Sequence, residues 1–432
     1  MKTQCTPCPI DYPANRSPGI TDTEFAALMD PLGPFGPGPR LAAAVSGGAD
    51  SVALAVLADA WARARAGSVL ALIVDHRLRP ASSSEATEAA GRLAARGIAA
   101  RGLTLTGLVP GASLAERARA ARYAALTEAC RNEGILHLLL GHHAADQAET
   151  VTMRALRGSG PAGLAGMAPV VETTFLRLLR PLLRVPPIRL RETLISLGIG
   201  WAEDPSNTDP RALRPRLRAL RADRDGTGAG TTALVVAANA AGRDRSRQEV
   251  AAGSALAAAV TIRCEGFALL SSAPLPVEAL SALVQTLSGA DFPPDPSAVA
   301  ALAATPRPAT LAGVRLLVAG RLGPDLLVVR ERAAMQAEIP AMPDTVWDRR
   351  FRLARHAAPP PSSTLGPLGV DAKRLRRWSD LPAAVLCTIP ALRCGGTLIA
   401  VPHLGYPTPE ACAAVPILFS PPRPATAVFF AT

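Results

Sequence analysis

The chain has 432 residues, of which 49% are hydrophobic, and carries a formal net charge of +11 at pH 7. This length suits two or three domains, and the excess of cations favours a polyanionic partner such as nucleic acid. Lysine occurs only at Lys2, in a proline-rich N-terminal segment, and at Lys373. The first half of the chain therefore has no lysine outside that segment. This excludes Walker-A kinases and pyridoxal-phosphate enzymes, because both need a lysine at the bound phosphate or cofactor. The seven scattered cysteines do not form a disulfide framework, and no signal peptide or membrane span is evident. We therefore expect a soluble, cytoplasmic protein.

The first 38 residues are rich in proline and glycine and are predicted to form a tail with one short helix near Thr23–Met29. After them, short apolar runs alternate with helical segments. Strands are expected at 41–45, 69–74, 101–105 and 137–140, and the helices that follow them at 51–65, 85–96, 113–133 and 144–157. This alternation predicts an α/β fold: a Rossmann-like parallel sheet with helices on both faces and ligands at the carboxyl ends of the strands.

The remaining chain is divided mainly by its breaker segments. The glycine-rich segment 223–231 is the best linker candidate, which places the catalytic domain at 39–224. A mainly helical region is expected at 225–335, with a hairpin at 313–331. Residues 336–432 are expected to form a mixed α+β C-terminal region.

The sharpest local feature is the segment Ser-Gly-Gly-Ala-Asp-Ser at 46–51, between the first strand and its helix. Glycines let the backbone approach a phosphate closely, and the start of a helix offers free N–H groups to an anion. Asp50 is unsuited to a bare phosphate and therefore indicates a bridging Mg²⁺ ion. The predicted ligands are ATP and Mg²⁺. The predicted nucleotide-binding residues are Ser46, Gly47, Gly48, Ala49, Asp50 and Ser51, with Asp50 as the metal ligand.

This segment resembles the S-G-G-x-D-S loop of PP-loop ATP pyrophosphatases, and further motifs resemble the tRNA(Ile)-lysidine synthetases within that superfamily. These motifs are Val74-Asp75-His76-Arg77-Leu78-Arg79 with Ser82 and Glu85, Ala118–Tyr123, Gly141–Thr150, Arg157–Met167 and Glu203–Asn207. Together they span about 41–221. The family has glycine at the position of Arg77, aspartate at Ala145 and asparagine at Pro215, where proline would kink or restart a helix.

The resemblance implies roles for individual residues. Asp75, at the tip of the second strand, is placed to meet the adenosine. Arg119 and Arg122 either stabilise charge on the α-phosphate or line a solvent-facing helix. The implied catalytic residues are Asp50, Arg119, Arg122, His143, Asp146 and Glu149.

His142, Asp146 and Glu149 are spaced i, i+4, i+7 and therefore share one helix face just past a strand. Two carboxylates there could hold the ammonium group of lysine or a Mg²⁺ ion. A zinc site is disfavoured, because one helix supplies too few convergent ligands and no cysteine joins them. A solvated helix N-terminus, where acidic residues are favoured, is the purely structural alternative.

A basic stripe is expected on the helix near 213–221. Its members are Arg211, Arg214, Arg218 and Arg221, while Leu213, Leu217 and Leu220 form another face that is expected to be core. The stripe suits RNA phosphates, although a merely solvated amphipathic helix has the same pattern.

The activity implied by the family is an ATP-dependent carbon–nitrogen ligation. The O2 atom of the wobble cytidine in tRNA(Ile) with a CAU anticodon attacks the α-phosphate of ATP, and free L-lysine then displaces AMP to form lysidine. The C-terminal region would serve tRNA recognition. No membrane partner is expected, and the oligomeric state, including a homodimer, stays open.

Three alternatives remain at this level. A tRNA thiolase would need a reactive cysteine pair, for which Cys5 and Cys8 are the candidates. A PP-loop ligase acting on a small metabolite would have little need of the basic C-terminal half. A non-catalytic nucleotide-binding module would have little use for Asp50 or for the cluster from His142 to Glu149.

Overall fold

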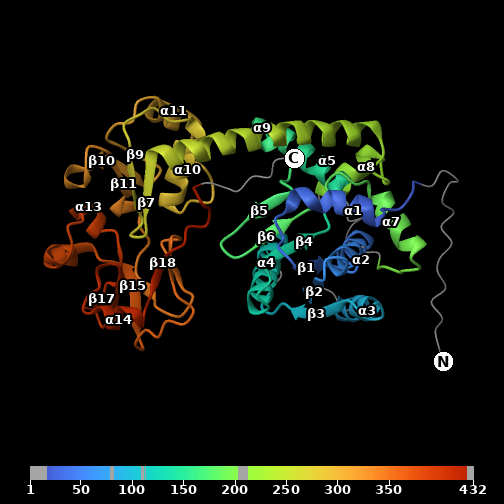
Figure 1. Cartoon of the computed structure of the whole chain (residues 1–432), viewed down its shortest axis with the longest axis horizontal. Helices are drawn as coiled ribbons and strands as arrows, with labels where there is room; N and C mark the ends of the chain where they lie inside the picture. Colours follow the sequence, from blue (N-terminus) through green and yellow to red (C-terminus); the bar gives the residue numbers. More distant parts are fainter. Residues whose placement is uncertain (1–16, 78–81, 109–110, 112, 203–212, 426–432) are drawn as a thin grey trace. The chain divides into compact units, whose positions relative to one another are not determined.

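The computed structural model describes residues 17–77, 82–108, 111, 113–202 and 213–425 (Figure 1). The described residues form two compact units, which divide between Arg245 and Ser246. This division falls inside α9 (Ala229–Ala259), a long continuous helix. No helix in the described part of the chain is long and apolar enough to cross a membrane.

The first unit is built on a mostly parallel sheet, six-stranded among the described residues, in the order β3-β2-β1-β4-β6-β5. The strands are β1 (Arg40–Val45), β2 (Ser68–Asp75), β3 (Ala99–Thr104), β4 (His137–Leu140), β5 (Val170–Glu172) and β6 (Arg177–Leu179). Only β5, at one edge, pairs antiparallel. The chain builds outward from β1 through β2 to β3 and then crosses to β4 on the other side, so β1 and β4 flank a topological switch point. The predicted α/β fold class is confirmed.

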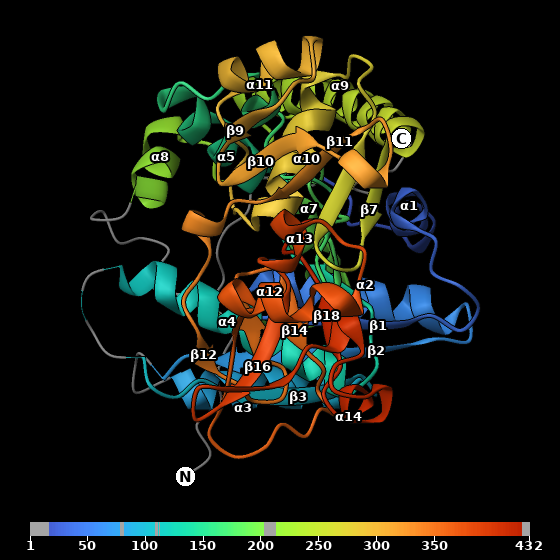
Figure 2. The ribbon, with the colours of Figure 1, turned by 90° about the vertical axis from the view of Figure 1, so that its left-hand side faces the viewer.

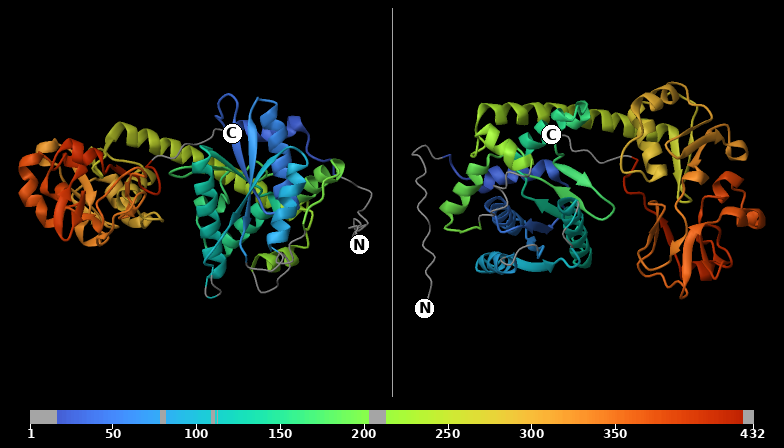
Figure 3. Two further views of the ribbon diagram at one scale, coloured as in Figure 1. Left: turned by 90° about the horizontal axis from the view of Figure 1, so that it is seen from below. Right: turned by 180° about the vertical axis from the view of Figure 1, so that it is seen from behind.

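Helices cover both faces of this sheet (Figure 3). The helices that follow β1 in this unit are α2 (Ala49–Arg63), α3 (Ser82–Ala94), α4 (Leu114–Asn132), α5 (Ala144–Leu156), α6 (Pro161–Leu164), α7 (Pro187–Ser196) and α8 (Leu213–Arg221). Successive strand residues point to opposite faces. Accordingly, Leu41 and Val45 of β1 pack with α2, whereas Ala42 joins a second core together with Leu126 and Cys130 of α4.

The segment before β1 packs into the first unit and differs in this from the predicted tail. Phe25 and Met29 of α1 (Asp22–Met29) are fully buried in the same core as α2. Arg189 of α7 binds both carboxylate oxygens of Glu24, at 2.5 and 2.7 Å, and donates to the carbonyl of Pro18. Residues 1–16 lie outside the described residues.

The segment predicted as a linker, 223–231, forms an ordered turn that begins α9. The Asp223 carboxylate accepts hydrogen bonds from the N–H groups of Thr227 and Gly228, both at 3.1 Å, and from the hydroxyl of Thr231. Such a carboxylate satisfies N–H groups that have no partner within the helix.

The second unit is mainly antiparallel (Figure 2). Its first sheet has the order β7-β8-β11-β10-β9, with β7 (Val260–Arg263), β8 (Phe267–Leu270), β9 (Ala309–Leu311), β10 (Val314–Val318) and β11 (Leu326–Arg330). Two smaller sheets follow, with the orders β12-β15-β16-β17 and β13-β14-β18. Their strands are β12 (Ile339–Pro340), β13 (Val346–Trp347), β14 (Phe351–Leu353), β15 (Ser363–Pro367), β16 (Pro390–Cys394), β17 (Thr397–Ala400) and β18 (Ile417–Phe419). The helices are α10 (Val277–Ser288), α11 (Pro296–Ala304), α12 (Ala372–Leu375), α13 (Ala383–Leu386) and α14 (Pro409–Ala413).

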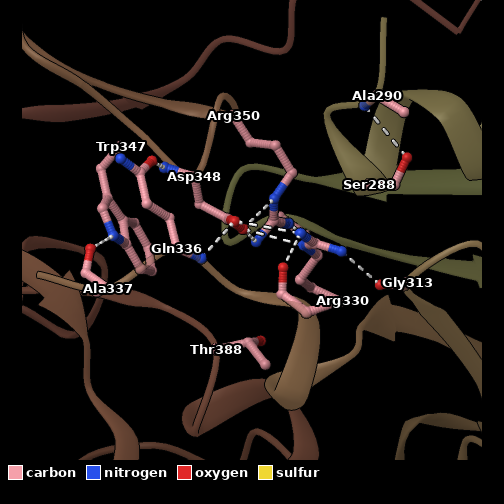
Figure 4. Close-up of polar contacts among 12 residues, drawn as sticks. Ser288, Ala290, Gly313, Arg330, Gln336, Ala337, Trp347, Asp348, Arg350 and Thr388 are labelled. Atoms are coloured by element: carbon pink, nitrogen blue, oxygen red, sulfur yellow. Dashed lines mark hydrogen bonds and ion pairs between the residues drawn. The ribbon is translucent and has the colours of Figure 1, made fainter. Parts of the chain in front are cut away.

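A buried ion cluster links the sheets of the second unit (Figure 4). Asp348, in the turn after β13, accepts from Arg350 at 2.7 Å and from Arg330 of β11 at 3.1 Å. Arg350 is fully buried and also donates to the carbonyl of Gly266, in the turn between β7 and β8. Burial lowers the pKa of Arg350 to about 10, although the neighbouring carboxylate of Asp348 opposes this effect. Because a buried charge is costly without a partner, the cluster favours one packing of these turns over others.

Candidate active site

The predicted site residues gather at the carboxyl edge of the first sheet. Parallel strands end at one edge, so the segments that follow β1, β2, β4 and β6 meet there. The helices α2 and α5 begin at this edge, and the first turns of α4 return to it from β3. Three groups of residues share the edge. They are the loop after β1 (46–51), called the phosphate-type loop, the acid cluster of Asp146 and Glu149 on α5, and a cluster of arginines formed by Arg119, Arg122 and Arg180.

The loop after β1 is held closed by its own serines. The Ser51 hydroxyl donates to the carbonyl of Gly48 at 3.0 Å and accepts from the N–H of Ser46 at 3.1 Å. Gly47 has a φ of +88°, in the left-handed region that glycine tolerates best. Gly48 is the N-cap of α2, so the loop leads directly to the unpaired N–H groups of that helix. These features make an anion cradle, in which Ser46 and Ser51 shape the backbone.

Asp50 lies in the first turn of α2 and fits the role of a metal ligand. Its Oδ1 atom is buried and has no hydrogen-bond partner among the described residues. Its Oδ2 atom lies 3.4 Å from Nε2 of His143. The described residues contain no cluster of three or more histidine, cysteine, aspartate or glutamate side chains that could cage a metal. A single carboxylate next to a phosphate cradle is the arrangement in which Mg²⁺ is commonly held, because phosphate and water complete its shell.

His143 connects Asp50 to the acid cluster. It is the N-cap residue of α5, and its Nε2 atom lies 3.4 Å from Asp50 and 3.6 Å from Asp146. Burial alone would lower the pKa of His143, but the carboxylates of Asp146 and Asp50 raise it to about 9. The contact of its Nδ1 atom with the Asp146 N–H is long, at 3.4 Å. The carboxylates of Asp50 and Asp146 thus favour the protonated ring, whereas the acceptor role of Nδ1 in capping α5 favours the neutral ring.

Glu149 is fully buried and is paired with an arginine that lies 69 residues further along the chain. Arg218 of α8 places Nε 2.5 Å from Oε1 and Nη2 3.4 Å from Oε2 of Glu149. Its Nη2 atom is also 3.2 Å from Oδ1 of Asp146. A two-pronged contact of this kind is among the stronger ion pairs in proteins, and it offsets the cost of burying Glu149.

The basic stripe predicted on α8 is only partly realised. Arg218 points inward to the acid cluster, and Arg221 donates to the hydroxyl of Thr231. Leu217 is buried as expected, but Leu220 is 82% exposed, so its prediction as a core residue was wrong. Arg211 lies outside the described residues. The pairing of Arg218 with α5 could not be found from local spacing, since it depends on how two distant helices pack.

The arginines of α4 form the third group. The guanidinium groups of Arg119 and Arg122 lie 5.1 and 5.4 Å from the centre of the Tyr123 ring. Arg180, which follows β6, is 8% exposed and donates to the carbonyl of Ala168 at 2.8 Å. Sequence reasoning did not select Arg180. A signal was available, namely a charged residue directly after an apolar strand of a parallel sheet.

Asp75, predicted to meet the adenosine, is fully engaged by its own loop. Its Oδ1 atom accepts from the N–H of Arg77 at 2.9 Å and from the hydroxyl of Ser82 at 2.7 Å, and its Oδ2 atom accepts from Ser83 at 2.6 Å. Burial would raise the pKa of Asp75, but these donors hold it below its usual value. Asp75 therefore links the end of β2 to the start of α3 by hydrogen bonds.

Comparison with known proteins places the chain in a family. The PP-loop domain family matches residues 21–221. The tRNA(Ile)-lysidine synthase of Mesorhizobium japonicum is 36% identical over 388 residues, which cover 85% of this chain and 84% of that protein. The chain belongs to the tRNA(Ile)-lysidine synthase family.

Other relatives match over a shorter region. The tRNA(Ile)-lysidine synthase of a Bradyrhizobium strain is 46% identical over 224 residues, or 51% of this chain and 63% of that protein. Two further relatives are matched over 58% and 51% of their own length. A solved structure of the U34-tRNA thiolase NcsA from Methanococcus maripaludis, with its [4Fe-4S] cluster, gives a TM-score of 0.42 at 16% identity, over 50% of this chain and 78% of that chain.

One departure from the family pattern has a structural explanation. Arg77 adopts a φ of +50°, the left-handed conformation that the glycine of the tRNA(Ile)-lysidine synthases reaches more easily. Pro215 does not interrupt α8, which continues past it to Arg221. Nothing in the structure explains Ala145. Leu78, Arg79 and Glu203–Asn207, which also carry the family motifs, lie outside the described residues.

Proposed function

We propose that the chain ligates L-lysine to C2 of the wobble cytidine of tRNA(Ile) with a CAU anticodon, at the cost of converting ATP to AMP and pyrophosphate. The cytidine O2 atom forms a bond to the α-phosphorus and pyrophosphate leaves, which gives an adenylated base. An amine of lysine then forms a bond to C2, loses a proton, and AMP leaves. A tRNA substrate implies action in the cytoplasm.

One observation carries the proposal: the phosphate-type loop and the acid cluster are physically joined at the same sheet edge. The joining contact is the 3.4 Å approach of His143 to Asp50, on the side of His143 that also faces Asp146. A nucleotide held by the loop would therefore react beside Asp146 and Glu149. The membership of the chain in the tRNA(Ile)-lysidine synthase family supports the same reaction.

The first step needs positioning and neutralisation of charge more than covalent help from the protein. The loop glycines and the N–H groups that begin α2 bind phosphate oxygens. Asp50 would hold Mg²⁺, which supplies charge neutralisation on the phosphates when it is bound. One of the two arginines Arg119 and Arg122 would add positive charge near the developing charge of the α-phosphate.

The second step needs a site for a cationic amino acid. In the structure, the guanidinium group of Arg218 is the cation on the carboxylates of Asp146 and Glu149. We infer that an ammonium group of lysine shares Asp146 with Arg218, because Asp146 has contacts with both His143 and Arg218 and is the more accessible of the two acids.

The test is incorporation of labelled lysine into RNA. The protein is incubated with ATP, Mg²⁺, labelled L-lysine and a tRNA(Ile) transcript with a CAU anticodon, and the label in the RNA is counted. Label that requires ATP and the wobble cytidine is expected. Asp50→Asn should abolish it, because Asp50 is the proposed Mg²⁺ ligand. Asp59→Asn serves as the matched control on α2, since Asp59 pairs with Arg63 away from the loop and should keep the activity.

The same assay separates the rival activities. Pyrophosphate release that depends on tRNA, without any lysine in the RNA, would contradict the ligase and favour thiolation. In that case Cys5→Ala and Cys8→Ala would be tested next; both cysteines lie outside the described residues. Pyrophosphate release without tRNA would favour a small-molecule ligase instead, and ATP binding without turnover would favour a non-catalytic nucleotide-binding module.

A further inference from the structure

A group of cationic side chains lies at the sheet edge beside the acid cluster. Three arginines carry its charge, and two histidines whose pKa values are lowered interact with them: Arg119, Arg122, Arg180, His76 and His142. They come from separate elements, namely α4 and the segments that follow β6, β2 and β4. Tertiary folding therefore concentrates positive charge at one place, which is unfavourable unless an anion is bound there.

Several nitrogens of this group are buried and have no hydrogen-bond partner among the described residues. They are Nε of Arg122, Nε of Arg180, Nδ1 of His76 and Nδ1 of His142. Arg180 is the most constrained of these side chains, since it is 8% exposed and its Nη1 atom is held by the carbonyl of Ala168. Buried donors without acceptors are rare in folded proteins. The two arginine nitrogens are donors, and each histidine Nδ1 is a donor in one of its two neutral tautomers. The cluster therefore lacks an acceptor, and an oxyanion is the group that would satisfy it.

The titration of His142 reports the same excess of positive charge. The pKa of His142 is lowered to about 4 by burial and by the guanidinium groups of Arg180, Arg119 and Arg122, although Asp146 opposes them.

The position of the cationic group favours the carboxylate of an amino acid over a phosphate. His142 and Asp146 lie four residues apart at the start of α5, so the cationic group and the acid cluster are neighbours. The phosphate-type loop lies at the switch point between β1 and α2 and has its own backbone donors. A phosphate beside His142 would be repelled by Asp146, whereas an amino acid would place its ammonium group on the acids and its carboxylate on Arg180.

We propose that Arg180, together with His142, forms an oxyanion subsite that binds the α-carboxylate of the amino-acid substrate. This inference rests on the proposed function, because it assumes that a free amino acid enters the site. Arg180 is thereby a residue that determines specificity: it distinguishes an amino acid from a simple amine of the same length.

The experiment compares L-lysine with cadaverine, which is lysine without its carboxylate, as the amine transferred to tRNA. The wild-type protein is expected to have a lower KM for lysine than for cadaverine. Arg180→Gln should raise the KM for lysine by roughly 10- to 100-fold, as expected for the loss of a charged hydrogen bond. The KM values for cadaverine and ATP should stay unchanged, and Arg180→Lys should recover part of the preference for lysine.

Two controls keep this experiment informative. Arg177→Gln removes a partly buried arginine of β6 that pairs with Glu172, and it should leave the ratio of the two KM values unchanged. The melting temperature of each variant shows whether a loss of activity reflects unfolding. If Arg180→Gln does not fold, His142→Gln is measured in the same way, because His142 belongs to the same subsite.

The outcomes separate the inference from the proposed function. An unchanged ratio of KM values in Arg180→Gln, while the wild-type protein transfers lysine, would overturn the subsite and leave the ligase intact. An increase in the KM for ATP, or for tRNA, with both amines alike would also overturn it and assign the cationic group to a nucleotide or RNA phosphate. Failure of the wild-type protein to transfer or bind lysine would refute the proposed function, and the subsite with it.

Discussion

At the scale of single side chains, the candidate site is built from buried charged residues. Glu149 is fully buried, and its charge is compensated by Arg218 at 2.5 Å. His143 is held between two carboxylates, and one oxygen of Asp50 has no hydrogen-bond partner within the described part of the chain. Charged groups buried in this way are costly unless they are paired or bind a ligand, which is why such clusters concentrate at functional sites.

The pair of Glu149 and Arg218 predicts a coupling that can be measured. Arg218→Ala leaves Glu149 buried without its guanidinium partner and should lower the free energy of unfolding by about 2 kcal/mol. Glu149→Gln in the same protein should recover part of this loss, so the two changes will not add. Urea unfolding of the two single variants and of the double variant measures the coupling. Additive effects would contradict the pairing.

His137 predicts a dependence of stability on pH. Burial, with a smaller effect of Arg177, lowers the pKa of His137 from 6.5 to about 4, a difference worth about 3 kcal/mol. The folded protein therefore keeps the ring neutral while the unfolded chain protonates near pH 6.5. The contribution is present above pH 6.5 and is lost as the pH falls towards 4.

This prediction is tested by urea unfolding at pH 7.5 and pH 4.5. The free energy of unfolding should fall by less in His137→Phe than in the wild-type protein, because phenylalanine cannot titrate and can keep the edge-on contact with Phe35. Equal losses in the two proteins would assign the acid sensitivity to other groups.

At the scale of whole elements, the first unit includes more of the chain than the alternating strands and helices that begin at β1. The helix α1 contributes Phe25 and Met29 to the core shared with α2. It is tied to α7 through the contacts of Glu24 and Pro18 with Arg189. The segment before β1 is thus a structural part of the unit.

Phe25→Ala should therefore lower the free energy of unfolding by about 3–5 kcal/mol, because it removes a fully buried aromatic side chain. Thr23→Ala, at an exposed position of the same helix, is the control and should change the stability by less than about 0.5 kcal/mol. Both values are obtained from chemical unfolding. A small effect of Phe25→Ala would show that α1 does not contribute to the core.

The distribution of charge matters at the scale of the whole molecule. The net charge is +11, and the only lysine of the described residues, Lys373, lies with Arg374, Arg376 and Arg377 in one exposed stretch beside Trp378. Such a stretch suits contact with RNA phosphates, which supply affinity without sequence information.

Replacing Arg376 and Arg377 with glutamine should weaken tRNA binding for every sequence alike. It should also reduce the slope of log Kobs against log salt by about 1 to 2, as expected when one or two phosphate contacts are lost. Filter binding between 50 and 200 mM salt measures the slope, as an order-of-magnitude test. The KM for ATP should not change. An unchanged slope would remove this stretch from the proposed RNA interface.

The sequence by itself determined the features that depend on neighbours in the chain. The eight strands and helices expected between 41 and 157 are present, because hydrophobic periodicity is a local property. The loop from Ser46 to Ser51 could likewise be recognised, since its hydrogen bonds join residues at most five positions apart. The proximity of His143 and Asp146 follows from a single helix turn.

Only the tertiary structure decided which distant residues meet. The contact of Arg218 with Glu149 depends on the packing of α8 against α5, and that of Arg189 with Glu24 on the docking of α1. The environment of Arg180 depends on where β6 joins the sheet. The physical reason is that a contact between remote residues forms only when the burial of entire elements offsets the entropy of closing the chain between them. A short sequence pattern does not predict this difference between the free energy of burial and the entropy of closing the chain.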